Sequence, residues 1–355
     1  MSNHSVRAFK HVFAVLLFIV VVSSAIYLSA QVSDVQVNTV ALKLFRPLPS
    51  VMDSPDNPVT DAKVKLGRML YYETRLSAGQ DISCNTCHAL DAYGAEPEPV
   101  STGHKGQKGN RNAPTVYNAA GHFVQFWDGR APDVEEQAKG PVLNPAEMAM
   151  PSDAAAVRTL ESMPEYVALF RQAFPKEKSP VTFNNMALAI GAFERGLVTP
   201  SRWDRFLTGD NSALTRAEKR GFNKFVDAGC PSCHNGAYVG GNSFQKLGIV
   251  EPWPNESDLG RHKITKQDAD KLVFKVPSLR NITKTAPYFH DGSVATLEEA
   301  IRRMSVHQRG SHLSDAEVKS IVTWFGALTG QIPFDYIKQP ALPKSSPGAP
   351  VLPSD

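Results

Sequence analysis

The sequence predicts a mainly α-helical protein with long loops, built from two similar halves. Apolar residues recur every three or four positions in Asp153–Phe174 and Thr182–Val198, which is the spacing of one helix face. Alternating patterns typical of strands are scarce, and several motifs occur twice in the same order. Dividing 355 residues by about 150 per domain gives about two domains, which agrees with two halves.

Composition excludes several classes of protein. With 42% hydrophobic and 21% charged residues, the chain is neither disordered nor collagen-like. The net charge is only +3, which argues against a broad nucleic-acid-binding face, so we expect no nucleic-acid partner. Four cysteines in 355 residues are too few for a disulfide scaffold.

Residues 1–33 are expected to form a signal peptide or an N-terminal membrane anchor. Arg7 and Lys10 precede the uninterrupted apolar run Val12–Val22, a pattern typical of export segments. The stretch Val12–Ala30 is close to the ~20 residues that span a bilayer, and a buried core helix is the alternative. Cleavage and anchoring are equally compatible with the sequence, and both deliver the remaining chain outside the cytoplasm.

Local signals predict three helix starts and two extended ends. Thr215, Thr296 and Ser314 each precede a glutamate by three residues, the pattern of a capping box. Residues 34–60 contain four prolines and are expected to be an extended lead-in. The last 25 residues contain six prolines, so the tail at 332–355 is expected to be loose or extended over the surface.

The internal repeat carries the prediction of two halves. The matches in chain order are Cys84–His88 with Cys230–His234, Arg111-Asn112 with Arg280-Asn281, Phe126–Gly129 with Phe289–Gly292, and Glu135-Glu136 with Glu298-Glu299. Their order is the same in both halves, whereas the loop lengths between them differ. This pattern indicates duplication of one unit, and its period is far longer than that of a solenoid repeat.

The two cysteine motifs predict two covalently bound c-type haems. Cys-x-x-Cys-His is the haem attachment signature, in which both thiols join the porphyrin and the histidine binds the iron. Cys84, Cys87 and His88 form the first motif, and Cys230, Cys233 and His234 form the second. A four-cysteine zinc site would have its pairs about 15–20 residues apart. Two disulfides would leave the adjacent histidines unexplained.

The second axial ligand of each iron decides whether that iron accepts electrons or stays open for chemistry. Met304 is the only methionine after His234, and a His/Met pair raises the reduction potential. In the first half, His104 lies in a glycine-rich loop and His122 follows it, and spacing does not choose between them. Alternatively, Met304 is an ordinary core methionine, and the histidine is an exposed surface residue.

Other residues have less specific signals. Glu147, in an apolar and proline-containing segment, is a candidate proton carrier, although a helix N-terminal charge is the simpler interpretation. Trp127 is a candidate electron relay or a core residue, and Gln137 alone indicates little. Oxygens of Asn112, Thr285 and Pro287 suit a hard cation such as calcium, but no acidic calcium loop occurs.

These residues together resemble the bacterial di-haem cytochrome c peroxidases, a family that includes the MauG-type enzymes. The resemblance runs from about Val59 to Gly330. Its distinctive stretches are Cys84–His88, Arg111–Thr115, Phe126–Arg130, Asn144–Met148, Cys230–His234, Thr285–Gly292 and Met304. The resemblance implies two cytochrome-c-like domains with one haem each, a peroxidatic domain at 41–199 and an electron-transfer domain at 200–331.

The resemblance also implies a role for each matching residue. His234 and Met304 would bind the electron-accepting iron, while His88 and, at rest, His104 would bind the peroxidatic iron. Gln137 and Glu147 would belong to the distal pocket, with Glu147 as the acid–base group. Trp127 would lie between the haems. A structural calcium would use the side chain of Asn112 and the carbonyls of Thr285 and Pro287.

The resemblance finally implies a function and partners. We expect reduction of hydrogen peroxide in the periplasm, with electrons from a c-type cytochrome, a copper protein or a quinol, by a homodimer. A MauG-like oxidase of a protein side chain is one alternative, but MauG-type proteins have a tyrosine where this chain has Met304. A di-haem electron carrier without enzymatic activity is the other alternative.

Overall fold

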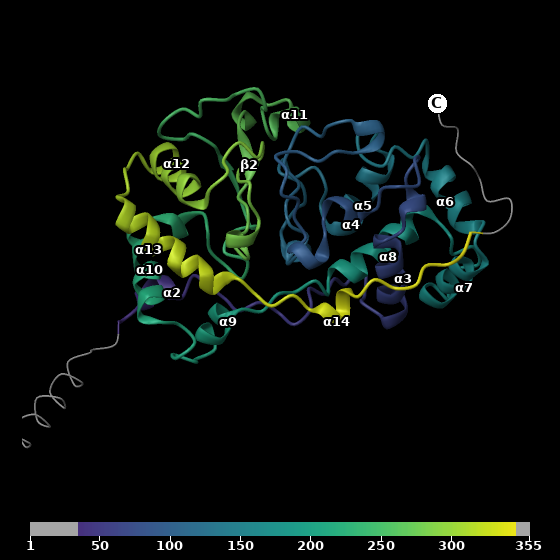
Figure 1. Ribbon diagram of the computed structural model, residues 1–355, viewed down its shortest axis with the longest axis horizontal. Coiled ribbons are helices and arrows are strands. Elements are labelled where there is room, and N and C mark those ends of the chain that lie inside the picture. Colours follow the sequence, from purple (N-terminus) through teal and green to yellow (C-terminus); the bar gives the residue numbers. More distant parts are fainter. Residues whose placement is uncertain (1–34, 346–355) are drawn as a thin grey trace, which may run out of the picture. The chain divides into compact units, whose positions relative to one another are not determined.

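The computed structural model describes residues 35–345, and from Val37 onward these residues form one compact unit (Figure 1). The expected signal peptide or anchor at residues 1–33 lies outside the described residues. Within residues 35–345, no helix is both long enough and apolar enough to cross a membrane. Helices and loops dominate the described chain, so the prediction of a mainly α protein is confirmed.

We call residues 50–199 the first half and residues 200–331 the second half. The first half contains α3 (Asp61–Tyr71), α4 (Cys84–Cys87), α5 (Val134–Leu143), α6 (Asp153–Glu161), α7 (Pro164–Ala173) and α8 (Phe183–Glu194). The second half contains α9 (Arg202–Leu207), α10 (Arg216–Asp227), β1 (Phe244–Lys246), α11 (His262–Thr265), β2 (Val273–Lys275), α12 (Leu297–Arg309) and α13 (Asp315–Phe325). Two short helices lie outside the halves, α2 (Thr39–Leu42) and α14 (Phe334–Ile337). The two strands are antiparallel, with Phe244 opposite Lys275.

Two of the three predicted capping boxes are present. Thr215 begins α10 and Ser314 begins α13, each with the reciprocal side-chain and backbone bonds of a capping box. Thr296 begins α12 by accepting a bond from the backbone N–H of Glu299. The Glu299 carboxylate instead accepts a hydrogen bond from Arg303 at 2.8 Å, so this start has a simple N-cap rather than a box.

The helical pattern at Asp153–Phe174 corresponds to two helices rather than one. Helix α6 ends at Glu161, and α7 starts at Pro164 with proline in its first turn. Proline has no N–H to donate and disfavours helical backbone in the residue before it, so the chain turns at Met163. Apolar spacing continues across the break because α6 and α7 pack against the same core.

Each half has its own buried apolar cluster. The first is built mainly from α3, α6, α7 and α8, and the second mainly from α9, α10, α12 and α13. A glycine permits the closest helix crossing in each cluster. A Cβ on Gly67 of α3 would lie 1.8 Å from the carbonyl oxygen of Ala189, and a Cβ on Gly221 of α10 would lie 2.1 Å from that of Ser320. The two crossings are therefore built in the same way.

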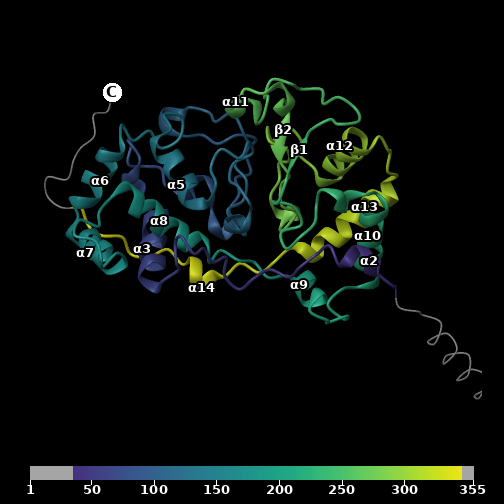
Figure 2. The ribbon, with the colours of Figure 1, turned by 180° about the vertical axis from the view of Figure 1, so that it is seen from behind.

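The two ends of the described chain each pack on the half that is remote in sequence (Figures 1 and 2). Phe45 of the lead-in is 2% exposed within the second cluster, against Trp203. Ile337 of the tail belongs to the first cluster, and the Tyr336 hydroxyl donates to the Phe193 carbonyl at 2.8 Å. The expected loose or extended tail contains the short helix α14, and only residues 338–345 lie extended on the first half, where Arg75 donates to the carbonyl of Pro343. The two halves are thus joined by both ends of the described chain as well as by the linker between them, at residues 199–200.

The backbone gives the internal repeat a definite register. Phe126 and Phe289 both have positive φ, at 64° and 71°, as do Asn118 and Asn281, at 61° and 62°. Both pairs are separated by 163 residues (289 minus 126, and 281 minus 118). Helices α5 and α12 also start 163 residues apart (297 minus 134). These three independent matches define the structural equivalence of the halves.

One part of the predicted repeat is wrong in register. The match of Arg111-Asn112 with Arg280-Asn281 requires an offset of 169 (281 minus 112), whereas the structure has 163. Asn118 is the counterpart of Asn281, since each has left-handed backbone and starts a short 3-10 helix. The counterpart of Asn112 is Lys275. The shared Arg-Asn dipeptide is a coincidence of sequence.

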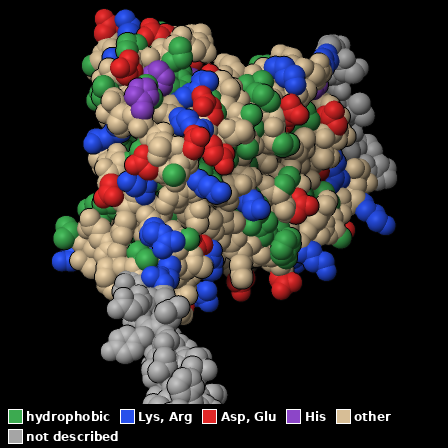
Figure 3. Space-filling view, turned by 60° about the vertical axis from the view of Figure 1, so that its left-hand side comes forward, with side chains coloured by type: hydrophobic (Ala, Val, Ile, Leu, Met, Phe, Trp, Pro, Cys, Tyr) green, Lys and Arg blue, Asp and Glu red, His purple; other side chains and the backbone are tan. Residues whose placement is uncertain are grey.

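Charges of both signs are mixed over the surface in Figure 3. Lysine and arginine side chains alternate there with aspartate and glutamate, and hydrophobic side chains are scattered among them. This face has no continuous basic field of the kind that a nucleic acid would need.

Candidate active site

The two cysteine motifs occupy a helical turn in each half. Cys84–Cys87 forms α4, and Cys230 begins a 3-10 turn that ends at Ser232. All four thiols are free and partly buried. Burial raises the pKa of Cys84 and of Cys230 to about 12, so neither is a thiolate at neutral pH. Neither Cys84 nor Cys230 is therefore placed as a catalytic nucleophile.

The histidine of each motif is prepared as a neutral ligand. His88 Nδ1 lies 3.2 Å from the Gly94 carbonyl, and His234 Nδ1 lies 3.4 Å from the Val239 carbonyl. An Nδ1–H donated to a carbonyl leaves Nε2 unprotonated and available to a metal. Burial lowers the pKa of His88, and it lowers that of His234 to about 4. Both motifs thus fit a c-type haem, in thiol placement and in histidine tautomer.

Met304 lies on α12 beside a small apolar cluster of the second half. Its side chain packs against this cluster, which consists of Leu247, Trp253, Leu272 and Phe274. The indole N–H of Trp253 is buried and has no partner among the described residues. A buried N–H without an acceptor costs free energy, so this position suits an acceptor outside the polypeptide, such as a haem propionate. The surroundings of Met304 therefore fit a second haem.

The first half lacks a ligand at the position equivalent to Met304. With the offset of 163, Met304 corresponds to Pro141, which lies inside α5. A proline side chain has no atom that binds iron. A second axial ligand of the first half therefore cannot come from the position equivalent to Met304.

His104 is held next to Glu147 by the backbone. The His104 N–H donates to the Glu147 carbonyl at 2.8 Å. Gly103 permits this approach, because a Cβ there would lie 2.1 Å from the carbonyl oxygen of Ala146. His104 begins a 3-10 turn whose next residues, Lys105 and Gly106, have positive φ. Gln107, at the end of the turn, also donates from its side-chain amide to the Pro145 carbonyl at 3.2 Å.

Glu147 has the environment of a proton carrier. Burial raises the pKa of its carboxyl group, and the hydrogen bond from Asn144 and the charge of Arg130 oppose that rise. The Asn144 side-chain amide donates to Glu147 Oε1 at 2.8 Å and so orients the carboxyl group. A carboxyl group with a raised pKa exchanges protons more readily near neutral pH.

Gln137 lies one turn before Pro141 on α5 and is partly buried. The segment after α5 folds back on this helix, since the Met148 N–H donates to the Pro141 carbonyl at 3.1 Å. Gln137 and Glu147 therefore approach the same end of the first half. No direct bond joins their side chains among the described residues.

Trp127 lies at the contact between the halves. Its indole N–H donates to the Asn112 carbonyl at 3.0 Å, and its ring is 6.4 Å from that of His290 in an edge-to-face arrangement. The backbone carbonyl of Trp127 accepts from the N–H of Lys275 at 2.7 Å. This residue therefore has contacts in both halves. His122 also faces the second half, with its ring against Tyr238.

The three expected calcium ligands offer neutral oxygens. Asn112 is 7% exposed, and its backbone N–H donates to the His290 carbonyl at 2.8 Å. The carbonyls of Thr285 and Pro287 accept no hydrogen bond among residues 35–345. Unengaged carbonyls and an amide oxygen form a donor set that fits calcium. The described residues contain no cluster of three or more acidic, histidine or cysteine side chains that could hold a metal.

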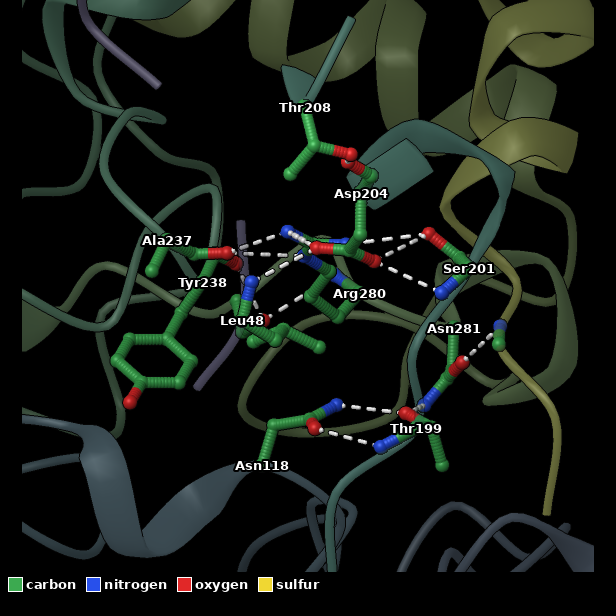
Figure 4. A network of polar contacts seen from close by, with 12 residues as sticks. Leu48, Asn118, Thr199, Ser201, Asp204, Thr208, Ala237, Tyr238, Arg280 and Asn281 are labelled. Carbon is green, nitrogen blue, oxygen red and sulfur yellow. Dashed lines mark hydrogen bonds and ion pairs between the residues drawn. The ribbon is translucent and has the colours of Figure 1, made fainter. Parts of the chain in front are cut away.

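A network of polar side chains that the sequence did not predict joins the two halves (Figure 4). Arg280 is 1% exposed and donates to both carboxylate oxygens of Asp204, at 2.8 and 2.9 Å. Thr199 in the linker receives bonds from the side chains of Asn118 and Asn281, at 2.8 and 2.9 Å. The two equivalent asparagines therefore meet at one hydroxyl. The sequence match of Phe126–Gly129 with Phe289–Gly292 has an offset of 163, and the same offset relates Asn118 to Asn281. Extending that match to the preceding residues would therefore have identified this pair of asparagines.

Comparisons with known proteins agree with this geometry. A family model described as di-haem cytochrome c peroxidase matches residues 61–212. The chain is 44% identical over 317 residues to the cytochrome c551 peroxidase of Pseudomonas aeruginosa, with 87% of this chain and 90% of that protein covered. It is 45% identical over 288 residues to the cytochrome c551 peroxidase of Nitrosomonas europaea, with 81% and 85% covered. A solved MauG-like protein associated with microbial copper homeostasis is 30% identical, with a TM-score of 0.73 and coverage of 82% of this chain and 97% of that chain.

Proposed function

The chain belongs to the family of di-haem cytochrome c peroxidases, and we propose that it reduces hydrogen peroxide to two waters in the periplasm. The balanced reaction consumes one peroxide, two protons and two electrons, which a small donor protein supplies. When bound, the haems supply the redox chemistry. The polypeptide must hold the groups, keep one site accessible and deliver protons.

The second half is the electron-accepting side in this proposal. His234 and Met304 serve as its two iron ligands, and a His/Met pair raises the reduction potential. The apolar packing around Met304 supports this role, because it excludes water from the ligand. Trp127 connects this half to the first, since it has bonded contacts in both.

The first half is the peroxidatic side. His88 would hold the iron of this half, and His104 would be its second ligand at rest. The loop of His104 then moves away to admit peroxide. Gly103 and Gly106 support such a movement, because glycine accommodates a change of backbone conformation at low cost.

Glu147 transfers a proton between the two oxygens of the peroxide, and Gln137 orients the substrate. A carboxyl group positioned by Asn144 and with a raised pKa suits this transfer. Calcium, bound through Asn112, Thr285 and Pro287, holds the contact between the halves. The family resemblance further supports a homodimer and a location outside the cytoplasm, after export by residues 1–33.

One observation carries the division of labour: α12 presents Met304 where α5 presents Pro141. A pure electron carrier would need both irons permanently six-coordinate, whereas the second ligand proposed for the first half, His104, lies in a glycine-containing loop rather than on α5. A MauG-like side-chain oxidase would not depend on Met304 for electron entry.

The test is a redox titration of the holoprotein followed by visible and EPR spectra, together with a peroxide assay. We expect two distinct low-spin centres when oxidised, a cyanide-binding first centre when half-reduced, and peroxide-dependent oxidation of a reduced cytochrome c. A first centre that stays low-spin and ignores cyanide, without turnover after pre-reduction, would identify an electron carrier instead.

A further inference from the structure

The contact between the halves is itself symmetric. The Asn112 N–H donates to the His290 carbonyl at 2.8 Å, and the Lys275 N–H donates to the Trp127 carbonyl at 2.7 Å. The two donors are 163 residues apart (275 minus 112), and so are the two acceptors (290 minus 127). The two bonds are therefore the same bond repeated by an approximate two-fold axis between the halves.

The same offset relates the expected calcium site to a second group of residues. Asn112 corresponds to Lys275, Thr285 to His122, and Pro287 to Val124. This correspondence uses only the register defined by the positive-φ residues and by α5 and α12. It predicts that Lys275, His122 and Val124 also come together.

The structure brings these three residues into contact. Lys275 Nζ lies 3.2 Å from the Val124 carbonyl oxygen and 3.4 Å from His122 Nδ1. Lys275 is only 8% exposed, and it forms no ion pair among residues 35–345. The His122 carbonyl accepts no hydrogen bond among these residues either.

We propose that the Lys275 ammonium group is a built-in cation, which takes at this second site the place that a metal ion takes at the Asn112 site. The ammonium group is surrounded by neutral acceptors, as a metal ion at the equivalent carbonyls would be. The carboxylate whose charge acts on Lys275, Asp128, forms ion pairs with Arg111 and Arg130 and makes none with Lys275 among residues 35–345. The inference rests on the calcium site proposed above.

A charged lysine is compatible with this buried position. Burial lowers the pKa of Lys275 to about 8, and the charge of Asp128 opposes that shift. The group therefore remains mostly protonated at neutral pH. A tethered ammonium group is always present in the folded chain, so the contact of residues 122–124 with the second half does not depend on free calcium. By contrast, residues 285–287 are joined to Asn112 only while the metal is bound.

The proposal is tested by replacing the built-in cation with the metal ligand of the other site. In the Lys275→Asn holoprotein, we expect about two bound calcium ions per chain where the wild type binds about one, since an amide and two carbonyls are a suitable set for calcium. Metal content is measured by equilibrium dialysis and elemental analysis after calcium removal and readdition. Lys275→Met, which also removes the charge but provides no ligand, should remain at about one.

The reciprocal variant provides an independent measurement. Asn112→Lys should lose the bound calcium, and calcium addition should no longer raise its melting temperature. Asn112→Met should lose calcium too, but without a lysine in its place it should melt below the Asn112→Lys variant. A wild type without calcium would overturn the proposed calcium site. A wild type with one ion and Lys275→Asn also with one, or equal melting of the two Asn112 variants, would overturn the built-in cation.

Discussion

The two halves use the same helix for opposite purposes. Helices α5 and α12 begin at equivalent positions and follow equivalent turns, but α12 presents Met304 where α5 presents Pro141. Only the first half has a carboxyl group with a raised pKa beside a glycine-containing loop, at Glu147. The comparison teaches that a duplicated unit acquires two roles through a few positions, while the helix crossing beneath them stays the same.

Removing the proton carrier should have the largest effect. Glu147→Gln keeps the size and the bond to Asn144 but cannot exchange a proton, so peroxide turnover should fall roughly 10²–10⁴-fold. Stopped-flow reduction of the second half by the donor should be unchanged. Glu161→Gln, an exposed carboxylate on α6, is the matched control. Turnover within twofold of the wild type would remove Glu147 from the proposed chemistry.

Removing Met304, the proposed iron ligand of the second half, should reduce the difference between the two iron centres. Met304→Leu keeps the apolar volume but has no sulfur, so the reduction potential of the second centre should fall. Each ~59 mV lost makes electron acceptance about tenfold less favourable. Potentiometric titration measures the shift, and Met163→Leu in the first core is the control. An unchanged potential would show that Met304 is an ordinary core methionine.

The glycine crossings should respond alike in both halves. A Cβ at Gly67 or Gly221 meets a backbone carbonyl within 2.1 Å or less, so each change to Ala should cost about 1–3 kcal/mol of unfolding free energy. Gly326→Ala is the control, since no atom lies within 4 Å of its Cβ position. Denaturant unfolding of the holoprotein checks this. A cost in only one half would contradict their structural equivalence.

A further expected effect depends on pH. When the crossing of α3 with α8 is matched to that of α10 with α13, Glu194 at the end of α8 corresponds to Phe325 at the end of α13. Burial raises the pKa of the Glu194 carboxyl group to about 8. In the unfolded chain a glutamate has a pKa of about 4.3. Between this pH and the folded pKa of Glu194, the folded chain binds more protons than the unfolded chain, so the free energy of unfolding falls as pH rises.

Glu194→Gln should remove that contribution. The variant should therefore gain stability over the wild type at pH 8 and little at pH 4, as measured by denaturant midpoints across this range. Glu161→Gln should leave the slope unchanged. A wild-type slope that persists in Glu194→Gln would assign it to other groups.

The strongest local signals in the sequence were sufficient for the fold class and the two cofactor motifs. Cys84–His88 and Cys230–His234 are short motifs whose chemistry depends on adjacent residues, so they can be recognised without the fold. The starts of α10 and α13 were predicted for the same reason, because a capping box needs only four residues. The break at Met163 was missed, although Pro164 indicated it, because apolar spacing continued across it.

Long-range relations needed the tertiary structure. The shared Arg-Asn dipeptide suggested a register that the left-handed backbone at Asn118 and Asn281 corrected. The contact of His104 with Glu147 joins residues 43 positions apart (147 minus 104), and no local pattern predicts it. The pairing of Lys275 with His122 depends on a two-fold relation between halves, which sequence similarity this weak does not reveal.

By itself, the sequence determined which chemical groups are present: four thiols in two motifs, two adjacent histidines and one later methionine. It determined them because such motifs act through residues that are neighbours in the chain. Only the tertiary structure decided which groups face one another, that Pro141 occupies the position equivalent to Met304, and that Lys275 occupies the position equivalent to Asn112. Packing decides these relations, because burial and contact depend on how both halves and both ends of the described chain fold together.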